Sequence, residues 1–369
     1  MEKQDILLLK RGEQMVTRKE VADKAGVSVS VVSRAMNNSG YVEAEKKKRI
    51  LAIAEELGYY PHPVAEALQK RRTKQILFFC KDLKNSFYID MYRGMVEAAG
   101  KRNYMVVFNG SLDFEKIRNA MIDGIIMPNE GVTQHYLDTV GKNYHLPAVS
   151  ASYGNPSGFS RAVPRVEINM ARVMELAIRT LRENGHRRIA LGMPYPFCSP
   201  DARKLAFCSL MKETLGEKLK DYYIGVHRED MAEDSRILSF LEDEKREDGM
   251  QLLEEDFFGK GELAARLFAE RRLDATAVVA FNDEFALGMC KGFRSLGLRV
   301  PEDISIIGID GSSARKYMDP LLTSVGLFPE KQGAKCADTL LDMLEGKKVK
   351  YVSGSPVRLV KGGSVRKIR

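Results

Sequence analysis

The stretch TRKEVADKAGVSVSVVSRAMN, residues 17–37, contains two short helical patterns separated by a tight turn. Thr17 and Glu20 have the spacing of a capping box, in which the hydroxyl accepts a backbone N–H and the carboxylate reaches back to the first residue. This spacing predicts a helix that runs to about Lys24. Gly26 then suits a turn, and Ser28 is a favourable cap for a second helix. Two short helices joined in this way form a helix-turn-helix.

The second helix of this pair carries more apolar side chains than one buried face can use. Val32, Ala35 and Met36 lie at positions i, i+3 and i+4 and form the stripe expected of a core face. Val29 and Val31 then point in other directions. Either these valines pack on another part of the same chain, or they are left for a partner molecule.

A third helix and a proline-containing segment follow the pair. Residues 43–57 predict a helix that turns Ile50 and Ala54 inward and the run EKKKR outward, and that ends at Gly58. The next segment, YYPHPVAEALQKRRTK at residues 59–74, contains two prolines that prevent this helix from continuing. Residues 64–69 are long enough for only one or two helical turns, too few to be stable alone. We therefore expect a linker that becomes helical only in a suitable environment.

The positive charge of the chain is concentrated at its N-terminal end. The formal net charge is +8, and residues 1–74 hold 15 Lys and Arg against 10 Asp and Glu. A basic module followed by a nearly neutral body is the asymmetry expected when one end of a protein meets a polyanion. The alternative is a basic surface that is simply solvated.

Several classes of protein are disfavoured by what the sequence lacks. The apolar runs at residues 76–80 and 277–281 are far shorter than the ~18 residues that span a bilayer. The first 15 residues do not have the pattern of a secretion signal, so we expect a cytoplasmic protein without membrane contact. The cysteines are odd in number, spread along the chain and without a C-x-x-C pair, which indicates reduced thiols and no metal site. These cysteines are Cys80, Cys198, Cys208, Cys290 and Cys336.

From Lys74 onward apolar strands alternate with amphipathic helices, which is typical of parallel sheets covered by helices on both faces. The first set has strands near residues 76–80, 104–108, 124–127 and 147–150, with helices at 88–101 and 132–142. The second set has strands near residues 188–193, 275–281 and 304–309, with helices at 170–183, 201–214, 261–271 and 283–295. Two such sets predict two similar α/β lobes.

Residues 221–256 interrupt this alternation with clustered Glu and Asp. We interpret the segment as a solvated acidic insertion rather than as a binding site for a particular partner. His186, in the run Gly185–Arg188, stands where a helix ends and a strand begins, and we interpret it as a structural residue.

The stretch VTRKEVADKAGVSVSVVSRAMNNSGYVEAEKKKRILAIAEELGYYPHPVAEAL resembles the headpiece of the LacI/GalR family of bacterial transcription regulators. The body is similar as well, in ENGHRRIALGM, in FNDEFALGMCKGFRSLGLRVPEDISIIGIDGSSARKYMDPLLTSV and in FPEKQGAKCADTLLDMLEGK. The resemblance implies an all-α three-helix headpiece with a hinge helix, followed by two doubly wound parallel-sheet lobes like those of type I periplasmic binding proteins.

The resemblance also implies a division of the chain into domains. The headpiece would comprise residues 14–60 and the hinge residues 61–74. The effector-binding and dimerisation domain would comprise residues 75–369. Lobe 1 would contain residues of about 75–163 and 327–347, and lobe 2 residues of about 164–326 and 348–369, with the acidic insertion at 221–256.

In the family the second helix enters the DNA major groove, which gives the surplus valines a partner. Val29 and Ser30 match positions that touch base edges, and Arg34 would reach a base or a phosphate. Val31 replaces a threonine that contacts phosphate in many relatives. The resemblance implies further headpiece contacts from Thr17, Ser28, Val31, Ser33 and Asn37.

The hinge would bind the minor groove of the same site. Ala65 and Leu68 match residues that enter this groove, where Leu68 would act as an apolar wedge that kinks the duplex. His62 stands where many relatives have asparagine.

The resemblance places an effector cleft at the carboxyl ends of the strands. Residues that match effector-contacting positions are Phe87, Tyr88, Ser152, Phe197, Ser199, Arg203, Asn282 and Asp310. Relatives often carry an acidic residue where this chain has Ser152. Each of the main candidates also has a structural alternative: Phe87 and Tyr88 as core aromatics, Asn282 as a helix cap, Asp310 as a turn residue and Arg203 as one half of an ion pair.

Together these features predict a DNA-binding regulator, a homodimeric repressor of a metabolic operon whose two headpieces bind a near-palindromic operator and place it with the nucleoid. A sugar or related metabolite in the cleft would control it, and no cofactor is expected. The C-terminal run SPVRLVKGGSVRKIR lacks leucine heptads, so we expect a dimer, with lobe 1 in its interface. One alternative is control by a protein co-repressor. Another is a metabolic enzyme with an appended headpiece, which the absence of phosphate-loop, dinucleotide, zinc and serine-hydrolase motifs disfavours.

Overall fold

The computed structural model describes residues 16–60, 67, 72–81, 85–111, 113–140, 146–154, 163–227 and 256–368. The chain divides into two compact units, residues 1–73 and 74–369, each of which has its own core. No helix in the described ranges has both the length and the apolar character needed to cross a bilayer.

The first unit is the predicted three-helix bundle, formed by α1 (Arg18–Ala25), α2 (Val29–Asn37) and α3 (Ala44–Glu56). The capping box is present, since the Thr17 hydroxyl accepts from the Glu20 N–H at 3.3 Å and the Glu20 carboxylate accepts from the Thr17 N–H at 2.6 Å. Gly26 ends α1 in the left-handed conformation. Val21, Val32 and Ile50 are fully buried and join the three helices in one core.

Side-chain hydrogen bonds hold the ends of this bundle together. Arg49 on α3 donates to the Ala25 carbonyl at 2.7 Å, which satisfies an acceptor at the end of α1. Arg18 donates to the Tyr59 hydroxyl at 3.1 Å, so the start of α1 is joined to the residues after α3. The headpiece therefore closes with its own core and its own cross-links.

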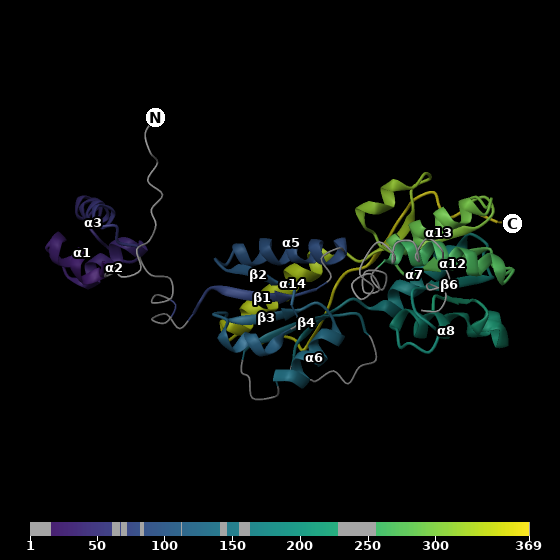
Figure 1. Ribbon diagram of the computed structural model, residues 1–369, viewed down its shortest axis with the longest axis horizontal. Helices are drawn as coiled ribbons and strands as arrows, with labels where there is room; N and C mark the ends of the chain where they lie inside the picture. The colour runs from purple at the N-terminus through teal and green to yellow at the C-terminus, as the bar shows by residue number, and fades with distance from the viewer. Residues whose placement is uncertain are drawn as a thin grey trace, which may run out of the picture. The chain divides into compact units, whose positions relative to one another are not determined.

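Lobe 1 of the second unit contains a parallel six-stranded sheet in the order β11-β5-β4-β3-β1-β2 (Figure 1). Its strands are β1 (Gln75–Phe79), β2 (Met105–Asn109), β3 (Gly124–Met127), β4 (Ala148–Ser152), β5 (Arg165–Glu167) and β11 (Val352–Gly354). Its helices are α5 (Ser86–Gly100), η1 (Phe114–Asn119), α6 (Glu130–Val140) and α14 (Pro329–Leu344). Helices α5 and α14 cover one face of the sheet, and α6 and η1 cover the other.

Lobe 2 contains a second six-stranded sheet, in the order β12-β10-β9-β8-β6-β7. Its strands are β6 (Ile189–Met193), β7 (Tyr223–Gly225), β8 (Ala277–Ala280), β9 (Ser305–Asp310), β10 (Thr323–Gly326) and β12 (Arg358–Val360). Its helices are α7 (Met170–Glu183), α8 (Ala202–Leu215), η2 (Gly216–Lys220), α12 (Phe257–Glu270), α13 (Asp283–Ser295) and η3 (Ser313–Tyr317). All pairs are parallel except β10 with β12, so the predicted pair of parallel α/β lobes is confirmed with one antiparallel edge.

The expected boundaries between the lobes are wrong at two places. β5, residues 165–167, pairs with β4, and β11, residues 352–354, pairs with β5, so both strands belong to lobe 1 rather than to lobe 2. Each strand has only three residues, and its place in the sheet is set by its partners and not by a local pattern.

The expected acidic insertion at 221–256 also begins too early, because residues 223–225 form β7 at the edge of the second sheet. Residues 228–255 lie outside the described residues.

Close helix packing in lobe 1 depends on glycine. A Cβ at Gly94 of α5 would lie 1.9 Å from the Glu330 carbonyl oxygen, and one at Gly333 of α14 would lie 2.0 Å from the Met91 carbonyl oxygen. The two helices therefore touch backbone to backbone, which a larger residue at either position would prevent.

His186 has the structural role expected from the sequence. The ring is fully buried, with Nδ1 2.9 Å from the Thr276 hydroxyl and Nε2 3.1 Å from the Arg366 carbonyl oxygen. Burial lowers the pKa of His186 below its usual range. The neutral ring with its proton on Nε2 satisfies both contacts.

Candidate nucleic-acid interface and ligand cleft

The outer face of α2 carries an apolar side chain that the headpiece core leaves uncovered. Val32 and Ala35 are buried, whereas Val29, at the first position of the helix, is 44% exposed. Ser30 and Arg34 are exposed as well. Val31 is half-buried and packs against the headpiece core, so it is only partly free to meet a partner. The face available to a partner is therefore Val29, Ser30 and Arg34, which we call the α2 outer face.

One hydrogen bond and the space beside a glycine define the position of the Arg34 side chain. Its Nε donates to the Ser30 carbonyl at 3.4 Å. Its aliphatic stem passes Gly40, where an added Cβ would lie 3.2 Å from Arg34 Cδ. Gly40 also has φ +71°, in the left-handed region. A glycine in this turn thus leaves room for the arginine stem.

The other expected DNA contacts of the headpiece already have partners inside it. The Thr17 hydroxyl takes part in the capping box, and the Ser28 hydroxyl lies 2.9 Å from the Ser30 hydroxyl. The Ser33 hydroxyl accepts from Asn37 Nδ2 at 3.4 Å. It also accepts from Arg18 Nη1 at 3.5 Å, so only its proton is left for a further bond. The Thr17 and Ser28 hydroxyls each keep a lone pair that can accept one more bond. The hinge candidates His62, Ala65 and Leu68 lie outside the described residues.

Sequence reasoning overlooked an exposed aromatic residue beside this face. Tyr41 follows Gly40 in the turn between α2 and α3 and is 86% exposed. An aromatic ring in a turn next to a basic helix was a signal available in the sequence. In the same region, Lys47 donates to the Asn38 side chain at 2.6 Å and bridges α3 to the end of α2.

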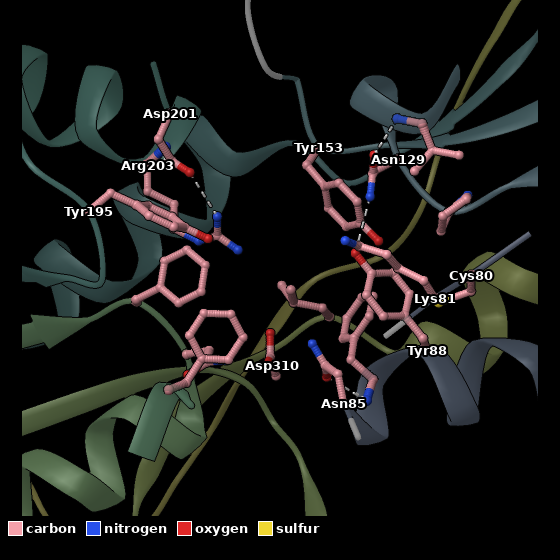
Figure 2. Close-up of a pocket in the computed structure, with 17 residues that line it drawn as sticks. Cys80, Lys81, Asn85, Tyr88, Asn129, Tyr153, Tyr195, Asp201, Arg203 and Asp310 are labelled. Carbon is pink, nitrogen blue, oxygen red and sulfur yellow. Dashed lines mark hydrogen bonds and ion pairs between the residues drawn. The ribbon is translucent and has the colours of Figure 1, made fainter. Parts of the chain in front are cut away.

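A cavity of about 360 Å³ lies between the two lobes of the second unit. It is lined by Cys80, Lys81, Asn85, Phe87, Tyr88, Pro128, Asn129, Val132, Tyr153, Tyr195, Asp201, Arg203, Phe257, Phe281, Asn282, Asp310 and Leu327. Figure 2 shows Tyr195, Asp201 and Arg203 on one side and Tyr88, Asn85 and Tyr153 on the other, with Asp310 between them. Both lobes therefore contribute to one site.

Five of the eight expected effector residues line this cavity: Phe87, Tyr88, Arg203, Asn282 and Asp310. The other three, Ser152, Phe197 and Ser199, are not among the residues that line it. Ser152 is buried, and its hydroxyl donates to the Glu130 carboxylate at 2.8 Å. The same carboxylate accepts from the Tyr153 N–H at 2.6 Å, so Glu130 holds the backbone that carries Tyr153 into the cavity.

The wall from lobe 2 is built around Arg203. Its Nη1 lies 3.2 Å from Asp201 Oδ2, and its guanidinium group lies 4.3 Å above the centre of the Phe281 ring. Asp201 also caps α8, because its Oδ1 accepts from the Arg203 N–H at 2.7 Å. The Nε of Arg203 is buried without a hydrogen-bond partner among the described residues. Arg203 is therefore both one half of an ion pair and a lining residue of the cavity.

The wall from lobe 1 is aromatic and is fixed by asparagine caps. The Phe87 ring meets the Tyr88 ring edge to face at 5.7 Å and lies 6.0 Å from the Tyr153 ring. Asn85 caps α5 by accepting from the Phe87 N–H at 3.0 Å. Asn129 donates to the Tyr88 hydroxyl at 3.4 Å. Phe87 is nearly buried, so it belongs both to the core and to the cavity.

One carboxylate, Asp310, lines the cavity at the end of β9, and a second, Asp283, is buried at the start of α13. Asp283 is fully buried and accepts from the Ser324 hydroxyl at 2.5 Å and the Ser312 N–H at 2.6 Å. Burial raises the pKa of Asp283 to about 6. Burial and the Asp283 charge raise the pKa of Asp310 well above its usual range. Asn282 lines the cavity and also caps α13, since its Oδ1 accepts from the Phe285 N–H at 2.8 Å.

This arrangement is suited to binding a small molecule. Aromatic side chains from both lobes can stack on the ring of a ligand, and the arginine, amide and carboxyl groups can form hydrogen bonds with its polar groups. No cluster of His, Cys, Asp and Glu in the described part of the chain could hold a metal ion.

Comparison with known proteins identifies both units. Residues 17–62 match the model of the lacI family of bacterial regulatory proteins, and residues 178–365 match the periplasmic binding protein-like domain. The transcriptional repressor PurR of Vibrio vulnificus is 26% identical over 90% of this chain and 93% of its own. Catabolite control protein A of Priestia megaterium is 28% identical over 84% of this chain and 87% of its own.

The fold comparison agrees with the sequence comparison. A crystal structure of the Lac repressor dimer bound to operator and the anti-inducer ONPF has a TM-score of 0.69 and 20% identity, over 96% of this chain and 100% of that one. PurR of Vibrio vulnificus and CytR of Escherichia coli, which is 26% identical over 95% of both chains, are named as transcriptional repressors. The chain therefore belongs to the LacI/GalR family of DNA-binding transcription regulators, with a helix-turn-helix headpiece followed by a periplasmic-binding-protein-like domain.

Proposed function

We propose that this chain is a homodimeric repressor that binds a near-palindromic operator and is controlled by a sugar or related metabolite in the cleft. The observation that carries the proposal is the α2 outer face, where Val29 is exposed although the headpiece core is complete. As part of this proposal, the chain would act in the cytoplasm, at the nucleoid.

The α2 outer face has the chemistry that base edges require. Val29 can contact a thymine methyl group, and the Ser30 hydroxyl can donate to or accept from a base. Arg34 lies one turn further along the helix, where a guanidinium group reaches a guanine or a phosphate. Its hydrogen bond to the Ser30 carbonyl reduces the conformational freedom that DNA binding would otherwise have to remove.

Exposed apolar side chains on lobe 1 support association of two chains. Ile89 and Val96 are exposed on α5 and are seven residues apart, which places them on one face of the helix. Met105, at the start of β2, is exposed as well. Two headpieces joined through such an interface would bind adjacent half-sites far more tightly than one headpiece alone.

The position of the cleft supports control by a ligand. Its walls come from both lobes, so a ligand that contacts both walls favours one relative orientation of the lobes. In a dimer this change would alter the spacing of the two headpieces and the ability of the hinges to fold on DNA. The state to which the ligand binds more tightly determines whether it releases the operator or promotes binding.

Selection from a pool of random duplexes tests the DNA-binding part of the proposal. The full chain should enrich a sequence with two related half-sites, and an Arg34→Ala variant should lose that enrichment. Leu51→Ala, which removes an exposed apolar side chain from α3, is the matched control and should enrich the same sequence. Enrichment that does not depend on Arg34 would contradict the assignment of the α2 outer face.

A thermal-shift panel tests the ligand part. Ribose, cellobiose, adenine and glucose 6-phosphate represent the sugars, nucleobases and phosphosugars, and a compound that binds the cleft should raise the melting temperature. The increase should disappear in an Arg203→Met variant. If none of these compounds raises the melting temperature, control by a protein co-repressor is favoured instead.

A further inference from the structure

The loop of residues 194–201 joins β6 to α8 and brings three side chains to the cleft. It carries Tyr195, ends at Asp201 and leads directly to Arg203. The loop sequence, PYPFCSPD, has proline, which lacks a backbone N–H, at three of its eight positions, and within the loop the Ser199 N–H donates to the Pro196 carbonyl at 3.1 Å. Hydrogen bonds from neighbouring elements reach the loop through its carbonyl groups.

A buried lysine on α8 binds the middle of this loop. Lys204 is 8% exposed, and its Nζ donates to the Phe197 carbonyl at 2.7 Å and to the Ser199 carbonyl at 2.5 Å. The Nζ also lies 5.1 Å from the centre of the Phe197 ring. Burying an ammonium group is costly unless it is hydrogen-bonded, and here two carbonyl groups and an aromatic face offset that cost. Lys204 is not among the residues that line the cleft.

A tyrosine on β7 binds the start of the same loop. Tyr223 is 4% exposed, and its hydroxyl donates to the Tyr195 carbonyl at 2.8 Å. Its ring meets the Phe197 ring edge to face at 5.0 Å. Burial raises the pKa of Tyr223 above its usual range, so the hydroxyl remains a donor. Tyr223, too, is not among the lining residues.

Contacts within the cleft would transmit any movement of this loop. The Tyr195 ring meets the Phe281 ring edge to face at 5.6 Å, and the Arg203 guanidinium group lies on the same Phe281 ring. We infer that Lys204 and Tyr223 are positioning residues that hold loop 194–201, and thereby set Tyr195 and Arg203 for effector binding without touching the effector. The inference rests on the proposed function only in its last step, the binding of an effector.

A fluorescent reporter tests the positioning without any ligand. The chain contains no tryptophan, so Tyr195→Trp introduces a single indole into the cleft wall. In this background Lys204→Met removes the ammonium group and keeps an unbranched stem, and Lys212→Met makes the same change at an exposed position of α8. We expect acrylamide to quench the tryptophan more strongly in the Lys204→Met variant than in the Lys212→Met variant, while both unfold cooperatively. Equal quenching in the two folded variants would overturn the inference.

A milder substitution covers the case in which Lys204→Met does not fold. Tyr223→Phe removes one oxygen atom and keeps the ring against Phe197. It should raise the quenching of the same tryptophan, whereas an unchanged value would overturn the inference.

The effect of the same substitutions on ligand affinity is measured with the panel of ribose, cellobiose, adenine and glucose 6-phosphate. With Tyr195 intact, the probe that binds the parent protein should bind about tenfold more weakly to the Lys204→Met variant and equally well to the Lys212→Met variant. Equal affinities in both variants would overturn the positioning role. If no probe binds the parent protein, that result counts against the proposed function, and the quenching experiment still decides the inference.

Discussion

The contact between Gly40 and Arg34 gives a quantitative test of the α2 outer face. An alanine at position 40 would place its Cβ 3.2 Å from Arg34 Cδ, so the arginine stem would have to shift by a few tenths of an ångström. Gly40 also has φ +71°, a conformation that costs an L residue about 1–2 kcal/mol. Gly40→Ala should therefore lower both the stability of the headpiece and its affinity for DNA.

Gly58→Ala is the matched control. Gly58 has φ +64°, nearly the same as Gly40, but a Cβ there would meet no atom within 4 Å. Both variants should lose about 1–2 kcal/mol in the free energy of unfolding, measured with urea. Only Gly40→Ala should lose further DNA affinity. A well-placed arginine contact is worth about 1–3 kcal/mol, and a partly displaced one should cost near the lower limit, about fivefold in the dissociation constant.

Fluorescence anisotropy with the selected duplex at fixed salt measures the affinities. A double-mutant cycle isolates the effect, because Gly40→Ala should have no further effect on affinity once Arg34→Ala is present. If Gly40→Ala and Gly58→Ala bind the duplex equally well, the reasoning that the space at Gly40 lets Arg34 reach DNA is refuted.

Four further predictions follow from other parts of the chain. In duplex selection, Val29→Gln should change which bases are preferred near the half-site centre. The control Leu51→Gln, at an exposed position of α3, should leave these preferences unchanged. A uniform loss of affinity for all sequences in Val29→Gln would count against base contact by Val29. Arg203→Met should abolish thermal stabilisation by the cleft ligand and leave the DNA affinity measured without ligand unchanged. The control Arg179→Met, at an exposed position, should retain the stabilisation. Stabilisation that is retained in Arg203→Met would show that the ligand binds elsewhere. The pKa of His186 is lowered in the folded chain from its usual value of 6.5, so the unfolded chain binds more protons as the pH falls below that value and the free energy of unfolding decreases on acidification. In His186→Asn the free energy of unfolding, measured with urea at several pH values, should depend less steeply on pH. Identical slopes in the two proteins would refute the role. Leu68→Ala should weaken operator binding and reduce DNA bending in a gel-shift phasing assay without affecting folding, and an unaltered bend angle would refute the wedge.

The helices were predictable because their start and stop signals are local. Residues 170–183 and 283–295 form helices with the expected bounds. Asn169 and Asn282 precede them and cap them, at 3.0 Å from the Arg172 N–H and 2.8 Å from the Phe285 N–H. A cap of this kind depends on residues within one turn of each other, so the sequence displays it directly.

The short strands were not predictable, because their partners are far away in the chain. β11, residues 352–354, exists only through its pairing with residues 165–167, and β12, residues 358–360, only through its pairing with residues 324–326. Three residues carry too little periodicity to indicate a strand. The errors in the lobe boundaries follow from this.

Four lining residues of the cleft follow one positional rule. Lys81, Asn129, Tyr195 and Asn282 each stand two residues beyond the end of a parallel strand, namely β1, β3, β6 and β8. The carboxyl ends of parallel strands meet at one edge, so such positions gather around the ligand. Only Asn282 was predicted. Ser152 does not line the cavity, because it is buried within β4 and bonded to Glu130, a partner that comes from a different element.

The most direct test of the account is the coupling between the cleft and the DNA. The affinity of the full chain for its selected duplex should be measured with and without the panel compound that stabilises it, and the affinity for that compound with and without the duplex. If one molecule carries both sites, the two ratios must be equal and different from one. We predict the same factor in both directions, and its loss in Arg203→Met. A compound that binds the cleft equally well in the presence and absence of the duplex would contradict the account.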